Sequence, residues 1–181
     1  AEEVSAGIDL SGKNAIVTGA NTGIGEETAR VLALRGARVV MACRHLQKAE
    51  AARTRILESI GDQVPAENIE VMLLDLNSLA GVRHFAQEFT ALDRPLHLLI
   101  NNAGIMSSER RETRDGFEAH YGVNYLSHFL LTHLLLDNLR AAKGARVVCV
   151  SSSAMIFSKM TEAFEDLNWE NRKYKGMESY G

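Results

Sequence analysis

A glycine-rich turn near the start of the chain constrains its fold more than any other stretch. The apolar run 15–17 predicts a short strand that is buried on both faces. Three glycines follow it, namely Gly19, Gly23 and Gly25, and a helical pattern begins directly afterwards. A strand, a glycine turn and a helix together present backbone N–H groups and a helix N-terminus to a phosphate. Because the spacing is G-x-x-x-G-x-G and not the commoner G-x-G-x-x-G, an ordinary tight connection is the alternative for the turn alone.

The rest of the chain alternates between strand-like and helix-like patterns. Apolar runs predict further strands at 38–43, 69–74, 96–100 and 146–150. Amphipathic patterns predict helices at 26–35, 46–60, 78–89 and 117–142, and residues 154–181 suggest a loop with helical turns. Such alternation implies right-handed crossovers and a doubly wound parallel sheet. A sheet of this kind binds its ligand outside the carboxyl ends of the strands.

Length and composition point to one domain. The chain has 181 residues, of which 46% are hydrophobic, and it contains only two prolines. A chain of this size can bury a substantial core, and no linker or internal repeat interrupts the pattern. We therefore expect a single α/β domain over residues 1–181.

The sequence disfavours several classes of site. The 20 Lys and Arg residues against 23 Asp and Glu residues give a net charge of −3, so nucleic-acid binding is not expected. The histidines show no metal-binding spacing, so we expect no metal site. Cys43 and Cys149 lie in apolar runs without a nearby partner, which predicts two buried free thiols in a reducing compartment. No apolar run is long enough to span a membrane, and no signal peptide is visible.

The end of the second predicted strand bears on the choice of cofactor. About 20 positions past such a turn, an acidic residue binds a ribose 2′-hydroxyl, whereas an arginine suits a 2′-phosphate. This chain has no acid there and carries Arg44, nineteen residues after Gly25. A guanidinium can bind phosphate through two hydrogen bonds, so Arg44 favours a phosphorylated dinucleotide. A solvated surface arginine is the alternative.

Other strand ends also carry polar residues. Asp75 could accept a hydrogen bond from an adenine amino group or could simply terminate its strand. The run 101–104 (Asn-Asn-Ala-Gly) combines amides with small residues that allow close approach to a flat ring, with ordinary turn chemistry as the alternative. Asn124 lies in an apolar helical pattern, where an amide without partners is costly. We therefore expect it to tie two helices together or to join a polar network at the site.

Taken in order, these motifs resemble one known family. They are the turn from Thr18 to Gly25, Asp75-Leu76, the run 101–104, Asn124, Val150-Ser151-Ser152 and Tyr180-Gly181. The ordered set resembles the short-chain dehydrogenase/reductase superfamily over nearly the whole chain, from about Ser11 onwards. The Asn-Thr-Gly-Ile-Gly turn and the Ala-Cys-Arg strand end resemble the branch of the retinol dehydrogenases, the WW-domain-containing oxidoreductase and related plant chloroplast proteins.

The resemblance implies a fold and a cofactor. The fold is a Rossmann-like sheet in the order 3-2-1-4-5, which family members normally continue with two more strands that this chain lacks. The cofactor is a nicotinamide dinucleotide across the strand ends, and Arg44 favours NADP(H). The positions that match the family's cofactor-binding residues are Gly19, Asn21, Thr22, Gly23, Ile24, Gly25, Arg44, Asp75, Leu76, Asn102, Ala103 and Gly104.

The resemblance also implies three catalytic residues. Ser152 would hold the substrate oxygen, Tyr180 would be the general acid/base, and Asn124 would join the proton relay. A tyrosine hydroxyl titrates near ~10, and the family uses a lysine four residues later to favour the phenolate. That position lies beyond Gly181, so we expect the chain to be a fragment of a longer oxidoreductase and inactive alone.

The branch implies an apolar alcohol or carbonyl substrate, such as a retinoid, a steroid or a lipid aldehyde. Five apolar residues could line its pocket, with core packing as the alternative: Met106, Met155, Ile156, Phe157 and Trp169. Family members often pair through the helix that carries Asn124, so a homodimer is an open alternative to a monomer. A cytoplasmic location is expected, although the branch also has organellar and membrane-anchored members.

Two other functions compete with this reading. The first is an NADP(H)-binding sensor or scaffold protein with little catalysis, which the retained Ser152, Tyr180 and Asn124 disfavour. The second is a nucleotide-binding methyltransferase domain. Arg44 disfavours it, because an acid at that strand end would suit a ribose diol.

Overall fold

The computed structural model of the chain describes residues 1–157 and 165–181. Its centre is a sheet of five strands, which are β1 (Asn14–Thr18), β2 (Arg38–Cys43), β3 (Ile69–Leu73), β4 (Leu98–Asn101) and β5 (Arg146–Cys149). The strand order is β3-β2-β1-β4-β5, and every neighbouring pair is parallel. The predicted Rossmann-like fold and its 3-2-1-4-5 order are therefore confirmed.

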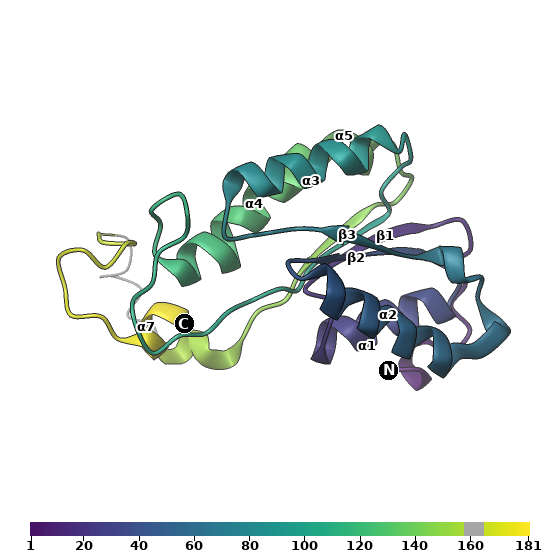
Figure 1. Ribbon diagram of the computed structural model, residues 1–181, viewed down its shortest axis with the longest axis horizontal. Coiled ribbons are helices and arrows are strands. Elements are labelled where there is room, and N and C mark those ends of the chain that lie inside the picture. Colours follow the sequence, from purple (N-terminus) through teal and green to yellow (C-terminus); the bar gives the residue numbers. More distant parts are fainter. Residues whose placement is uncertain (158–164) are drawn as a thin grey trace.

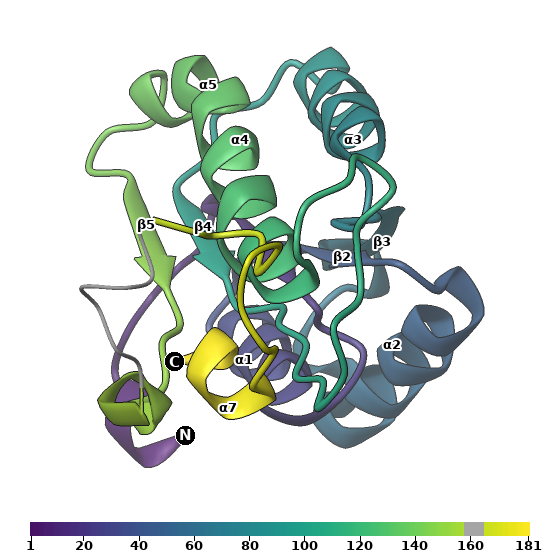
Figure 2. The same ribbon diagram turned by 90° about the vertical axis from the view of Figure 1, so that its left-hand side faces the viewer.

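Helices cover both faces of this sheet (Figure 1). One face carries α1 (Gly23–Leu34) and α2 (Leu46–Ile60), and the other carries α3 (Leu79–Ala91), α4 (Ser127–Leu134) and α5 (Leu136–Arg140). The shorter elements are η1 (Glu3–Ser5), η2 (Gly61–Gln63), η3 (Ala66–Asn68), the π-helical η4 (His120–Leu126), η5 (Ser153–Phe157) and α7 (Gly176–Tyr180). Figure 2 looks onto the carboxyl ends of the strands, with α7 in front of them.

Each face of the sheet packs against its own helices. Alanines of α1 and isoleucines of α2 fill the first core, including Ala29, Ala33 and Ile56. Phenylalanines of α3 and leucines of the α4–α5 region fill the second, including Phe85 and Leu131. Because β1 is buried on both faces, its carboxyl end and the turn that follows are held from two sides.

Two helix ends have the capping residues that helices favour. Ser78 caps α3, because its Oγ accepts a hydrogen bond from the N–H of Gly81 at 3.3 Å. Gly36 follows α1 with φ of +93°, the left-handed conformation that glycine adopts without strain. The start of α1 differs from the prediction: the helix begins at Gly23, so two of the three turn glycines belong to its first turn.

The single long helix predicted at 117–142 is wrong. An isolated bridge between Glu112 and Glu118 keeps the chain extended at first, so the helix begins at His120 with the wide π turn of η4. The regular helix α4 follows, and a break at Leu135 separates it from α5. The π turn is the part that borders the candidate site.

The prediction of two buried thiols is half wrong. Cys43 is buried, and burial raises the pKa of its thiol to about 11. Cys149 is exposed, because β5 is an edge strand whose residues all remain exposed.

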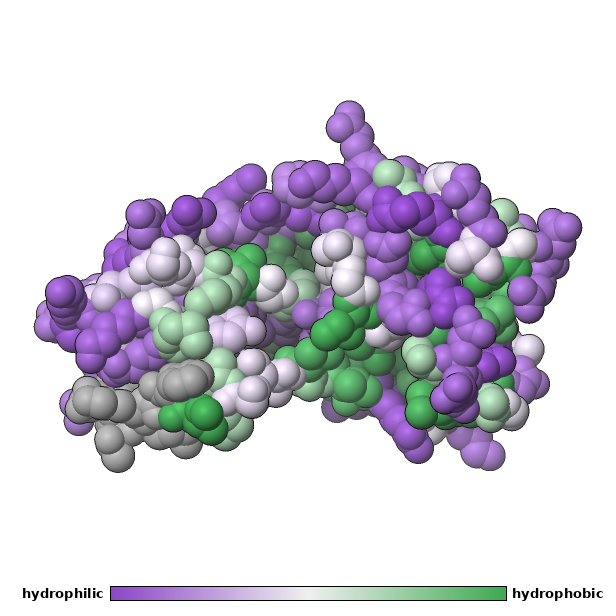
Figure 3. All heavy atoms as spheres, turned by 90° about the horizontal axis from the view of Figure 1, so that it is seen from below, coloured by the Kyte–Doolittle hydropathy of each residue, from purple (hydrophilic) through white to green (hydrophobic). Residues whose placement is uncertain are grey.

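Hydrophobic side chains gather near the middle of the face shown in Figure 3. Over the described ranges, no helix combines the length and apolarity that a bilayer crossing requires.

Candidate functional site

The glycine turn is packed directly against the loop that follows β4. A Cβ atom on Gly19 would lie 2.9 Å from the Cα of Ala103, and Gly19 has φ of +67°. A Cβ atom on Gly25 would lie 2.5 Å from both the amide nitrogen Nδ2 of Asn102 and the carbonyl oxygen of Gly19. Only glycine fits at these two positions without displacing its neighbours. Because α1 follows the carboxyl end of β1, its N-terminus lies at that edge of the sheet. The first N–H groups of a helix have no acceptor within the helix and can bind an anion there.

Thr18 fastens the two loops to each other. Its hydroxyl is fully buried and accepts hydrogen bonds from the backbone N–H groups of Asn102 and Ala103, each at 2.9 Å. The side-chain amide of Asn102 donates in turn to the carbonyl oxygen of Thr18 at 2.8 Å. The resemblance included Thr18 only as part of the turn. Its role in joining β1 to the loop after β4 depends on contacts between segments that are distant in the sequence.

Asn124 ties η4 to the loop after β4. Its Oδ1 accepts from the N–H of Ile105 at 2.9 Å, and its Nδ2 donates to the carbonyl oxygen of Ile105 at 3.0 Å. The expected tie between two helices is therefore a tie between a helix and a loop. Asn124 also lines the cavity described below, so it has a place in a polar network at the site as well.

His128 connects Thr18 to the π turn. Its Nδ1 lies 3.0 Å from the carbonyl oxygen of Asn124, which can only accept, so this nitrogen carries the proton. Nε2, 2.9 Å from Oγ1 of Thr18, is then the acceptor for the threonine hydroxyl. Burial lowers the pKa of His128, which agrees with a neutral ring. No sequence pattern indicated this connection.

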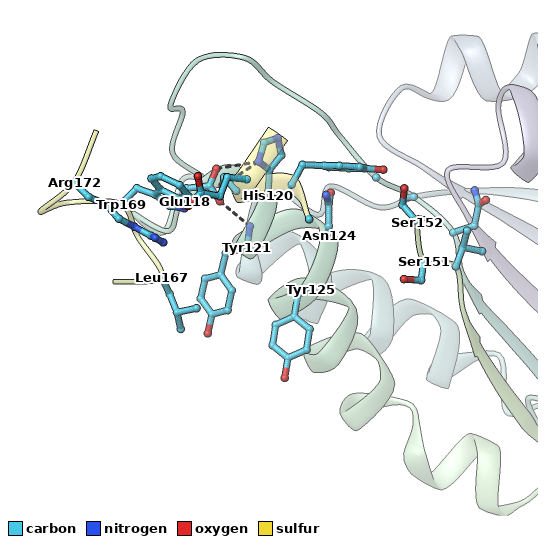
Figure 4. A pocket seen from close by; sticks show the side chains of 18 residues that line it. Glu118, His120, Tyr121, Asn124, Tyr125, Ser151, Ser152, Leu167, Trp169 and Arg172 are labelled. Carbon is cyan, nitrogen blue, oxygen red and sulfur yellow. Dashed lines mark hydrogen bonds and ion pairs between the residues drawn. The ribbon is translucent and has the colours of Figure 1, made fainter. Parts of the chain in front are cut away.

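A cavity of about 470 Å³ opens at the carboxyl edge of the sheet (Figure 4). It brings together the three predicted catalytic residues, Asn124, Ser152 and Tyr180, and part of the predicted cofactor set, Asn102, Ala103 and Gly104. Its other lining residues are Glu118, His120, Tyr121, Tyr125, Val150, Ser151, Leu167, Trp169, Arg172, Glu178, Ser179 and Gly181. The turn 19–25, Arg44, Asp75 and Leu76 lie outside this lining.

The second and third strand ends have different surroundings. Arg44 is exposed directly after β2, and its Nε–H donates to Nε2 of His45 at 3.2 Å. Asp75 accepts from the N–H of Asn77 at 3.1 Å and pairs with Arg114 at 3.2 Å, as a residue that terminates a strand would. Leu76 is buried and belongs to the second core.

Ser152 and Tyr180 come from two separate segments. Ser152 follows β5, and its Oγ accepts from the N–H of Ala154 at 3.1 Å. Tyr180 is the last residue of α7 and is half-buried. The two segments meet at the cavity, where both residues are in its lining together with Asn124. Two hydroxyl groups and an amide thus line one open cavity at the carboxyl edge of the sheet.

The predicted apolar lining is largely wrong. Trp169 is buried and lines the cavity, with the guanidinium of Arg172 over its ring at 3.6 Å. Met106, Met155 and Ile156 are exposed and do not belong to the lining. The side chain of Phe157 lies outside the described part of the structure.

A buried polar cluster at the cavity was missed by the sequence reasoning. Glu118 and His120 are 1% and 3% exposed, respectively, and Nδ1 of His120 lies 3.4 Å from Oε1 of Glu118 (Figure 4). The hydroxyl of Tyr174 donates to Oε1 of Glu118 at 2.9 Å, and burial raises the pKa of Tyr174 to about 12. The only sequence signal was a Glu-x-His pair at the start of an apolar helical pattern. Within the described ranges, no group of three metal-ligating side chains forms a site.

Comparisons with known proteins agree with this geometry. A family model described as short chain dehydrogenase matches residues 13–162. Human retinol dehydrogenase 12 is 48% identical over 171 residues, which are 93% of this chain and 52% of that protein. The chain thus spans about half the length of the curated relatives it matches.

Solved structures show the same fold. An uncharacterized protein from Mycobacterium paratuberculosis has a TM-score of 0.80 and 40% identity, and the match covers 96% of this chain and 57% of that one. The Pseudomonas aeruginosa RhlG/NADP active-site complex has a TM-score of 0.71 and 30% identity, with 96% and 62% covered. The chain therefore belongs to the short-chain dehydrogenase family, and its sequence places it in the retinol dehydrogenase branch.

Proposed function

We propose that this chain forms the cofactor-binding part and much of the catalytic site of an NADP(H)-dependent oxidoreductase that interconverts an alcohol and a carbonyl compound. The observation that carries the proposal is the meeting of Asn124, Ser152 and Tyr180 at one cavity. They come from η4, from the end of β5 and from α7, and the loop 102–104 borders the same cavity. Such a meeting is what an active site at the carboxyl edge of a doubly wound sheet requires.

The cofactor assignment rests on two features. The glycine turn and the N-terminus of α1 offer N–H donors for a pyrophosphate, and a Cβ atom on Gly23 would meet nothing within 4 Å, so open space adjoins the turn. The exposed Arg44 after β2 would hold the 2′-phosphate of NADP(H). A solved relative bound to NADP supports the same assignment.

The residues of this chain would divide the chemistry among them. The hydroxyl of Ser152 would hold the substrate oxygen, and the hydroxyl of Tyr180 would give or take its proton. Asn124 would belong to the proton relay while its side chain keeps η4 against the loop at Ile105. The nicotinamide supplies or accepts the hydride when it is bound.

The substrate is proposed to be an apolar alcohol or carbonyl compound of the retinoid, steroid or lipid aldehyde type. Tyr121, Tyr125, Leu167 and Trp169 give the cavity wall apolar and aromatic surface. The name of the human relative, a retinol dehydrogenase, supports this choice. A homodimer through the η4–α4 face is a further proposal, since Tyr125 and Phe129 are exposed there.

The test uses the full-length protein that contains this chain. NADPH oxidation is followed with retinal, a steroid ketone and a long-chain aldehyde, and NADPH affinity is measured separately. We expect turnover with at least one of the three. Tyr180→Phe should lower kcat by about 100-fold or more, as loss of a general acid/base does, while the Kd for NADPH stays within about twofold.

Two outcomes would contradict the proposal in different ways. NADPH binding without turnover of any of the three substrates would favour the sensor or scaffold function. Turnover that is unaffected by Tyr180→Phe would remove the assigned role of Tyr180. Ser152→Ala, assayed in parallel, separates a faulty assignment of one residue from a faulty assignment of the whole site.

A further inference from the structure

The buried cluster at the cavity contains an acid, an imidazole and a phenol that the proposed chemistry does not use. Glu118 accepts from the hydroxyl of Tyr174 through Oε1 and from the N–H of Tyr121 through Oε2, both at 2.9 Å. The N–H of Glu118 donates to the side chain of Asn168 at 3.0 Å. A carboxylate this deeply buried needs such donors, because removal from water is costly. Glu118 therefore joins the start of η4 to the segment 165–181.

The hydrogen bonds of His120 define its protonation state. Its Nε2 accepts from the backbone N–H of Ser107 at 2.8 Å, so this nitrogen carries no proton. Nδ1 is then the protonated nitrogen of a neutral ring, and it faces the oxygens of Tyr174 and Ser179, each at 3.2 Å. Both nitrogens are thus occupied within the protein. Burial lowers the pKa of His120 in spite of the nearby Glu118, which is consistent with a neutral ring.

The imidazole lies directly against the end of the chain that carries Tyr180. The ring of Tyr180 meets the ring of His120 edge to face, with the centroids 5.6 Å apart. Ser179, the neighbour of Tyr180, contacts Nδ1 of His120. α7 is also fitted closely at its start, because a Cβ atom on Gly176 would lie 2.8 Å from the Cα of Ser108.

Besides these contacts, α7 packs against η5. It is a five-residue helix, and none of its residues is fully buried. A short helix of this kind is not stable without tertiary contacts. The position from which Tyr180 reaches the cavity therefore depends on the packing of α7 on η5, on the loop 107–108 and on His120, and of these only His120 contacts the Tyr180 ring in an aromatic pair.

We propose that His120 is a positioning residue for Tyr180. Hydrogen bonds to Ser107 on one side and to the Tyr174–Glu118 pair on the other hold its imidazole neutral and in one orientation. The inference rests on the proposed role of Tyr180 as the acid/base. His120 acts through Tyr180 and exchanges no proton with the substrate, since its own nitrogens are occupied. A misplacement of about 1 Å in a reacting group can cost up to about 100-fold in rate.

The test compares two amide replacements in the full-length protein. In His120→Asn the amide nitrogen can take the place of the Nδ1 donor, whereas in His120→Gln the amide oxygen can take the place of the Nε2 acceptor. The measured quantity is kcat per NADPH-binding site, so that misfolded protein does not count. We expect His120→Gln to lose tenfold or more and His120→Asn to retain at least about three times the activity of His120→Gln, with the Kd for NADPH within about twofold.

Two further variants keep the test decisive. Tyr174→Phe removes one hydroxyl but keeps the ring that packs edge to face on Trp169 at 5.3 Å, so it tests the network if neither histidine variant folds. It should lower kcat per site by about threefold to tenfold. His97→Asn is the matched control, because the half-buried His97 accepts from the N–H of Asn14 at the opposite edge of the sheet.

The outcomes separate this inference from the proposed function. A wild-type protein without hydride transfer would refute the proposed function itself. If the wild type is active, equal kcat per site in wild type, His120→Gln and Tyr174→Phe would overturn the positioning role. So would a lower activity in His120→Asn than in His120→Gln, or a loss as large in His97→Asn.

Discussion

Arg44 is the residue on which the choice between the two nicotinamide cofactors is proposed to depend. Arg44→Asp places a negative charge where the 2′-phosphate would bind, so the Kd for NADPH should rise by about 10-fold to 100-fold. The Kd for NADH, which lacks that phosphate, should change by less than about threefold. Fluorescence titration with each cofactor measures both. Arg83→Asp, on the exposed side of α3, is the control, and equal losses for the two cofactors would refute the role of Arg44.

Thr18 offers a prediction about stability at the scale of a single hydroxyl group. Thr18→Val keeps the shape of the side chain but leaves the N–H groups of Asn102 and Ala103 without their acceptor. Each buried donor without a partner costs about 1–3 kcal/mol, so the loss of two partners should lower the free energy of unfolding by about 2–6 kcal/mol. Urea unfolding measures it. Thr18→Ser, which keeps the hydroxyl, should lose clearly less, and equal losses in the two variants would assign the effect to the methyl group.

Residue-level prediction from the sequence reached the motifs and little beyond them. Ser152, Tyr180 and Asn124 meet at the cavity as the resemblance implied. His120 and Glu118 were not found, because their importance comes from contacts with residues more than 50 positions later in the chain. Hydrogen bonds of this kind leave no periodic trace in a sequence.

At the scale of elements, η4 and its tie to the loop at Ile105 carry a second stability prediction. Asn124→Ala removes both hydrogen bonds to Ile105, so the N–H and the carbonyl group of Ile105 lose their side-chain partner. We expect hydrogen exchange of the Ile105 amide to accelerate by about tenfold or more, because local opening becomes easier. The amide of Leu99 in β4 should keep its protection and is the internal control. Unchanged exchange at Ile105 would show that the tie does not hold the loop.

Element prediction succeeded where the pattern is local and failed where tertiary contacts decide. Apolar runs placed all five strands within about two residues, because both faces of the sheet are covered. The π turn of η4 could not be predicted, because its apolar pattern does not differ from that of a regular α-helix. The exposure of Cys149 was wrong for a related reason: an apolar run does not reveal whether its strand lies at an edge.

At the scale of the whole molecule, three histidines link stability to pH. Burial lowers the pKa of His97, His120 and His128 in the folded state. The unfolded chain therefore binds more protons once the pH falls below ~6.5, the ordinary pKa of histidine. Stability from this source is fully present above that pH and is lost as the pH falls toward the folded-state values. Its slope is about 1.4 kcal/mol per pH unit for each proton that only the unfolded chain binds.

Urea unfolding between pH 7.5 and pH 5 should show this loss before most carboxylates titrate. We expect the free energy of unfolding to fall across this range. His128→Gln should flatten the fall, because a neutral amide replaces a buried titrating ring at the Thr18 hydroxyl. His84→Gln is the control, since His84 is exposed on α3 and should leave the slope unchanged. A stability that rises toward pH 5, or an equal slope in wild type and His128→Gln, would mean that His128 stays neutral without cost. The hydrogen bonds through which His128 joins Thr18 to Asn124 would then not determine the pH at which the fold loses stability.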